Sequence, residues 1–161
     1  PWNALTNAAF LCAAWLGWRA FARTGTTASA RLLVVLCGLI GLGSFAWHAT
    51  GAPWAQWADV LPILGFVLVF LYVALRALLG VPAPLAVAAC AALIGAALVA
   101  MRLFGPALNG SIAYVPVWLS LLALSVVLHL RRSTVWTRFA LATLLFAVSL
   151  TCRSIDVMVC A

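Results

Sequence analysis

Long apolar runs, broken by short polar or proline- and glycine-rich segments, are the feature that most constrains the fold. No Asp, Glu, Lys or Arg occurs between Arg102 and Arg131, and hydrophobic residues make up 68% of the chain against 7% charged. About 20 apolar residues in a helix cross a bilayer, and a helix satisfies its own backbone polar groups there. Soluble domains do not have this composition. The sequence therefore predicts an all-α polytopic membrane helix bundle.

The breaks divide the chain into six transmembrane helices within one helical domain, residues 1–161. The clearest breaks are 80–84 and 105–110, where glycine, proline and an Asn-Gly pair favour turns. A third break, at 51–53, separates the second helix from the third, which Pro62 is expected to kink. The second helix carries three glycines that allow a neighbour to approach closely, Gly38, Gly41 and Gly43. We expect the helices at about residues 2–22, 31–50, 53–80, 85–104, 112–131 and 134–152.

The net charge of +7 comes from nine arginines and no lysine, and their distribution orients the helices. Cytoplasmic loops of membrane proteins carry an excess of basic residues. We expect the N-terminus outside, which places most arginines on the inner side and only Arg102 and Arg153 on the outer side. The inner set is Arg19, Arg23, Arg31, Arg76, Arg131, Arg132 and Arg138. Charge of this kind indicates contact with lipid headgroups and no nucleic-acid partner. Arginine without lysine, with abundant alanine, favours a bacterial inner membrane.

The second and third helices carry a hydroxyl, an imidazole and a carboxylate inside apolar sequence. Ser44 and His48 are four residues apart on one helix face, and Asp59 follows the 51–53 break. At about 1.5 Å per residue, the distance from Ala52 along the helix axis is about 12 Å for Ser44, about 10 Å for Asp59 and about 6 Å for His48. Ionisable groups inside membrane segments are costly and rarely present without a use. The three residues therefore predict a metal or acid–base site.

Each of these residues also has a structural interpretation. His48 can be satisfied by hydrogen bonds between packed helices, and Ser44 can be a helix–helix hydrogen-bond donor and nothing more. Asp59 lies six residues past Pro53, which is too deep for it to cap the start of that helix. The carboxylate is therefore the residue whose position most favours a chemical role.

Three stretches resemble the alkaline ceramidase family, which belongs to a wider group of seven-helix, zinc-dependent lipid hydrolases that includes the adiponectin receptors. The most specific is a Ser-x-x-x-His pattern, with Gly-Ser-Phe before the His, then ten residues, then Asp-Val-Leu-Pro-Ile starting at Asp59. The stretch Pro1-Trp-Asn-Ala-Leu-Thr-Asn-Ala-Ala-Phe10 is similar to the family's first helix. The stretch Arg153-Ser-Ile-Asp156, with Cys160, is similar to the approach to its last helix.

The resemblance implies a hydrolase that cleaves the amide of a ceramide-like lipid into a long-chain base and a fatty acid. It implies that His48 binds Zn²⁺, that Asp59 is the general base for a metal-bound water or orients that water, and that Ser44 stabilises the oxyanion. In the family two further zinc ligands come from a His-x-x-x-His pair on a seventh helix, which is expected beyond residue 161. An acidic segment that binds Ca²⁺ is likewise expected before Pro1.

Other candidate residues are assigned structural roles. His129 precedes Arg131 and Arg132 on the predicted inner side, roughly 20 Å or more from His48, so we reject it as a second ligand. Arg153 and Asp156 are three residues apart and are expected to form an interfacial ion pair. The five cysteines show no metal-binding spacing, and only Cys160 is placed to pair outside this stretch.

Two other functions compete with the hydrolase. The first is a catalytically weak or inactive receptor-like or structural lipid-binding protein on the same bundle, which the absence of the His-x-x-x-His pair would favour. The second is a small transporter or proton relay that uses Asp59 and His48. No inverted repeat or pair of discontinuous helices is visible, which disfavours transport. The sequence leaves oligomeric state and the acyl chain of the lipid open.

Overall fold

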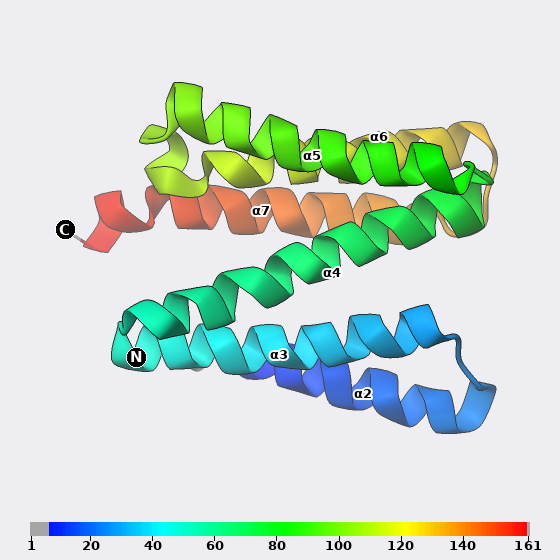
Figure 1. The fold of residues 1–161 in the computed structure, drawn as a ribbon, viewed down its shortest axis with the longest axis horizontal. Coiled ribbons are helices and arrows are strands. Elements are labelled where there is room, and N and C mark those ends of the chain that lie inside the picture. Colours follow the sequence, from blue (N-terminus) through cyan, green and yellow to red (C-terminus); the bar gives the residue numbers. More distant parts are fainter. Residues whose placement is uncertain (1–6, 161) are drawn as a thin grey trace. The chain divides into compact units, whose positions relative to one another are not determined.

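The computed structural model describes residues 7–160, apart from the side-chain surroundings at 22, 24 and 155–160. Within this range every regular element is a helix, which confirms the all-α prediction (Figure 1). The elements are α2 (Ala8–Thr24), α3 (Ala28–Thr50), α4 (Pro53–Leu79), α5 (Ala83–Phe104), the 3₁₀ segment η1 (Ala107–Tyr114), α6 (Val115–Leu130) and α7 (Trp136–Cys160).

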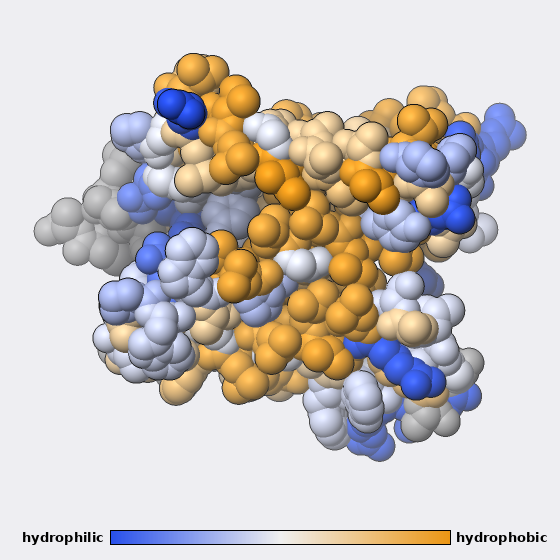
Figure 2. Space-filling view, in the orientation of Figure 1, coloured by the Kyte–Doolittle hydropathy of each residue, from blue (hydrophilic) through white to orange (hydrophobic). Residues whose placement is uncertain are grey.

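Four stretches are long and apolar enough to cross a membrane: α3, α4, α5 and the continuous stretch Ala107–Leu130. The apolar part of α2, Ala8–Phe21, is shorter. Large hydrophobic side chains are exposed on the helices, such as Leu42 on α3, Leu98 on α5 and Leu144 on α7. On the face drawn in Figure 2, hydrophobic residues cover the middle of the helices and hydrophilic residues gather toward their ends. Lipid, which is as apolar as these side chains, accounts for this pattern, and the chain is a membrane protein.

The chain divides into two compact units, the first ending at Ala74 and the second beginning at Leu75. The boundary falls inside α4. In the first unit, glycines on α2 and α3 bring the two helices together. A Cβ added to Gly17 would lie 2.8 Å from Cγ2 of Val34, and one added to Gly41 would lie 3.0 Å from Leu11. The prediction that Gly41 permits close approach is confirmed.

The hairpin between α3 and α4 has the tight turn that the sequence predicts. α3 ends at Thr50, and Gly51 adopts the left-handed conformation (φ 61°) with its N–H bonded to the carbonyl of Trp47 at 2.9 Å. Glycine is the residue that takes this conformation without steric cost. α4 then begins directly at Pro53, where a missing N–H is harmless. The turn sets the register between the two helices that carry Ser44, His48 and Asp59.

In the second unit, side chains join the ends of separate helices. The Arg131 guanidinium donates to the carbonyl of Leu79 at 3.1 Å, which ties the end of α6 to the end of α4. At the other end of α6, Nε of Arg153 on α7 donates to Oγ of the fully buried Ser111 in η1 at 3.0 Å. Within this unit Arg131 and Arg153 therefore lie at opposite helix ends, as the distribution of arginines predicts. The orientation of the chain in its membrane remains a prediction.

Three predicted boundaries differ from the structure by three residues or more, the first being α3, which begins at Ala28 rather than near 31. The fifth helix begins at Val115 rather than near 112, because η1 precedes it with left-handed backbone at Leu108 and Asn109. α7 continues to Cys160 instead of ending near 152. Arg153 lies within the extended α7, where its Nε donates to Oγ of Ser111 in η1.

Candidate functional site

The closest approach of α3 to α4 lies beside Asp59. Gly43 is buried against α4, and a Cβ added to it would overlap the carbonyl of Ala58, lying 2.5 Å from the carbonyl carbon and 2.9 Å from the amide nitrogen of Asp59. Because only a glycine fits here, the backbone of α3 touches the backbone of α4. Ser44, the next residue on α3, is thereby at the same level of the helix pair as Asp59. The sequence predicted this level from distances to the turn.

Acceptor atoms collect at this level. Pro62 lies inside α4 and has no N–H, so the carbonyl of Ala58 lacks the donor that an α-helix would supply four residues later. One carboxylate oxygen of Asp59, Oδ1, is buried and has no hydrogen-bond partner among the described residues. A buried acceptor without a donor is unfavourable. The arrangement therefore favours a water molecule, another donor or a cation next to Asp59.

Ser44 lies between the faces of α3 that meet α2 and α4. Gly43 and Leu36 face α4, while Gly41 and Cys37 face α2, where the Cys37 thiol lies 3.5 Å from the carbonyl of Phe10. At about 100° per residue, Ser44 is about 100° round the helix from Gly43 and about 60° from Gly41. Its side chain is buried, with 9% exposed. The buried Ser44 side chain thus lies on α3 between the face that contacts α2 and the face that contacts α4.

His48 lies in the last turn of α3, about 6 Å along the helix from Ser44 and nearer to the hairpin turn. Its side chain is exposed. Residues 7–160, wherever their side chains are described, contain no group of three His, Cys, Asp or Glu side chains that could hold a metal ion. The described residues on their own therefore do not supply the three protein ligands of a catalytic zinc. His48 remains the candidate for one of them.

Asn7 is the residue that sequence reasoning missed. It belongs to a stretch used only for the resemblance, and its type gave no signal of burial. In the structure Asn7 precedes α2, is 7% exposed, and its Nδ2 has no hydrogen-bond partner within the described part of the chain. Among the described residues, two buried side-chain atoms lack a hydrogen-bond partner: Nδ2 of Asn7 and Oδ1 of Asp59.

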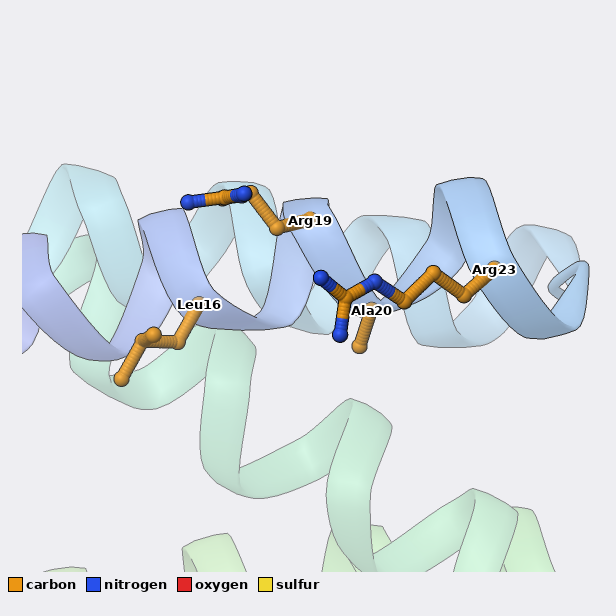
Figure 3. A pocket seen from close by; sticks show the side chains of 4 residues that line it. All are labelled: Leu16, Arg19, Ala20 and Arg23. Atoms are coloured by element: carbon orange, nitrogen blue, oxygen red, sulfur yellow. The ribbon is translucent and has the colours of Figure 1, made fainter.

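Other features lie outside this site. The His129 ring packs edge-on against Trp136 with centroids 4.6 Å apart, in keeping with the structural role predicted for it. A recess of about 280 Å³ on α2 is lined by Leu16, Arg19, Ala20 and Arg23 (Figure 3). Leu16, the first residue that lines the recess, is nine residues after Asn7, which is about 14 Å along α2. The predicted pairing of Arg153 with Asp156 and any partner of Cys160 fall outside the described side chains.

Comparison with known proteins assigns the chain to a family. Its sequence matches the family model described as Ceramidase over residues 1–161, the whole chain. The chain belongs to the ceramidase family. No curated protein and no solved structure matches it. Membership in the ceramidase family supports a ceramide-hydrolysing role in general, with a lipid substrate and membrane association.

Proposed function

We propose that the chain hydrolyses the amide bond of a ceramide-like lipid, releasing a long-chain base and a fatty acid, at the level where Ser44 meets Asp59. The observation that carries the proposal is the buried, unpaired Oδ1 of Asp59 in a chain of the ceramidase family. An acceptor in this state is ready to bind and deprotonate a water molecule. Exposed apolar side chains on the surrounding helices allow the lipid tails to approach from the bilayer.

The reaction balances with water as the only co-substrate. Asp59 accepts a proton from water while the water oxygen attacks the amide carbonyl carbon. The Ser44 hydroxyl donates a hydrogen bond to the carbonyl oxygen as negative charge develops on it, which stabilises the transition state. Asp59 then passes the proton to the amide nitrogen as the C–N bond breaks. The water oxygen remains in the fatty acid, and the nitrogen leaves as the free amine of the long-chain base.

Zinc dependence is part of the proposal. His48 would hold the ion together with ligands from residues beyond 161, and the acceptor-rich level of Asp59 suits a nearby cation. A bound zinc ion supplies a Lewis acid that polarises a carbonyl and acidifies water. The calcium ion expected from the family resemblance involves no described residue and stays a prediction.

Turnover of ceramide by the purified protein tests the proposed function. We expect ceramide in mixed detergent micelles to yield long-chain base and fatty acid in equal amounts, measured by mass spectrometry. A phosphatidylcholine substrate, which has esters in place of the amide, serves as the control for non-specific lipid hydrolysis. Binding of ceramide without release of either product would contradict the proposal and favour the receptor-like alternative. That alternative draws support from the exposure of His48 and the absence of a three-ligand group among the described side chains.

Zinc content tests the metal assignment separately. We expect about one zinc ion per protein after purification without chelators, and substantially less in His48→Ala, because removing one of three protein ligands leaves an incomplete site. His129→Ala is the matched control, since that imidazole is also exposed but packs on Trp136. Equal zinc in wild type and His48→Ala, measured by inductively coupled plasma mass spectrometry, would remove His48 from the site.

A further inference from the structure

Asn7 is placed where an asparagine normally caps a helix, yet it does not cap one. Asparagine at this position usually accepts a hydrogen bond from the first turn. Here Asn7 has helical backbone angles (φ −66°, ψ −19°), and its side chain makes no capping hydrogen bond to α2. The side chain is instead buried with its Nδ2 unpaired among the described residues. Its amide is therefore free to serve another group.

The register of α2 against α3 brings Asn7 to the level of Ser44. Three contacts define the register: Gly17 lies against Val34, Ala14 against Gly38, and Phe10 and Leu11 against Gly41. The residue numbers in each contact add to about the same total, as they do for antiparallel helices. Continuing the series by one turn sets Asn7 opposite Ser44 and Phe45. Asn7, Phe10, Ala14 and Gly17 also share one face of the helix, the face toward α3.

The three helices of the first unit thus contribute complementary groups at one level. Among the described residues, Nδ2 of Asn7 is a donor without a hydrogen-bond partner, and Oδ1 of Asp59 is an acceptor without one. The hydroxyl group of Ser44 on α3 is buried. A lipid amide undergoing hydrolysis needs these functions, because its carbonyl oxygen accepts hydrogen bonds and the attacking water must lose a proton. Asparagine side chains are among the donors that stabilise such oxyanions in other enzymes.

We propose that Asn7 donates a hydrogen bond from Nδ2 to the carbonyl oxygen of the substrate amide, beside the hydroxyl of Ser44. The inference rests on the proposed function and adds a substrate-contacting residue to it. Two donors from different helices hold the carbonyl oxygen, and Asp59 acts on the water.

The test compares Asn7→Leu with wild type. Leucine has nearly the same shape as asparagine and leaves no unpaired donor, so we expect the melting temperature in detergent to stay the same or rise. We expect kcat for ceramide to fall about 10²–10³-fold, the effect of removing one oxyanion donor, with KM changed only a few-fold. Gln56→Leu, which removes an exposed side-chain amide on α4, is the control and should leave kcat unchanged.

Different results separate this inference from the proposed function. If wild type hydrolyses ceramide and folded Asn7→Leu retains kcat within about threefold, well short of the loss expected for an oxyanion donor, the inference fails and the proposed function stands. If wild type hydrolyses no ceramide, the proposed function fails first. Should Asn7→Leu not fold, Asn7→Ala takes its place. Failure of both variants to fold would show that the amide holds the helices together, which also overturns the inference.

Discussion

The Asp59→Asn variant is expected to lose about 10²–10⁴-fold in the rate of ceramide hydrolysis, the range that a positioned general base contributes. Asparagine has the shape of aspartate but does not take a proton from water. The new side chain keeps this volume and brings an N–H donor where Oδ1 of Asp59 has no hydrogen-bond partner among the described residues, so the fold should tolerate it. The measurement is the initial rate of long-chain base release, with the melting temperature recorded alongside.

The control for this variant is Gln56→Ala, which alters an exposed polar residue nearly one turn earlier on α4. It should retain the wild-type rate, because its side chain is exposed. A folded Asp59→Asn protein that turns over ceramide at the wild-type rate would show that another group deprotonates the water. Asp59 would then be a structural residue, and its unpaired oxygen would need a different explanation.

Gly43→Ala is the second variant expected to have a large effect. The added methyl group would overlap the Ala58 carbonyl and lie 2.9 Å from the amide nitrogen of Asp59. Backbone atoms do not move aside as a flexible side chain does, so α3 and α4 must separate. Overpacking of this kind typically costs about 1–3 kcal/mol. We expect a lower melting temperature and loss of hydrolysis, because the level of Ser44 against Asp59 depends on this contact.

Gly95→Ala on α5 is the matched control for Gly43→Ala. A Cβ there would meet no atom within 4 Å, and Gly95 lies within a helix. The same chemical change should therefore leave stability unchanged or raise it by roughly 0.5–1 kcal/mol, since alanine favours a helix more than glycine does. If Gly43→Ala and Gly95→Ala have the same melting temperature, the close contact between α3 and α4 does not determine the site.

Much of the fold followed from the sequence because bilayer length and helix-breaking residues determine it. The runs between glycine and proline breaks predicted α3, α4 and α5 within a few residues, and Gly51 predicted the hairpin turn. The heights of Ser44 and Asp59 followed from the rise of a helix measured from that turn. The single domain of residues 1–161 stays a prediction.

The remaining features depend on tertiary contacts that periodicity does not show. The burial of Asn7 arises from the pairing of α2 with α3, and the residues next to it in the sequence do not predict this burial. The left-handed backbone of Leu108 and Asn109 in η1 is likewise accompanied by a contact distant in sequence, Arg153 with Ser111. Spacing placed His48 on the face of Ser44, but its exposure near the end of α3 is a property of the tertiary structure that spacing does not show.

The origin of the oxygen in the released fatty acid tests the central claim most directly. Wild-type protein is incubated with ceramide in water enriched in oxygen-18, and both products are analysed by mass spectrometry. We predict one labelled oxygen in each fatty acid and an equal amount of unlabelled long-chain base, at a rate that depends on Asp59. Bound ceramide recovered intact, or fatty acid released without the label, would contradict direct hydrolysis of the amide by this site.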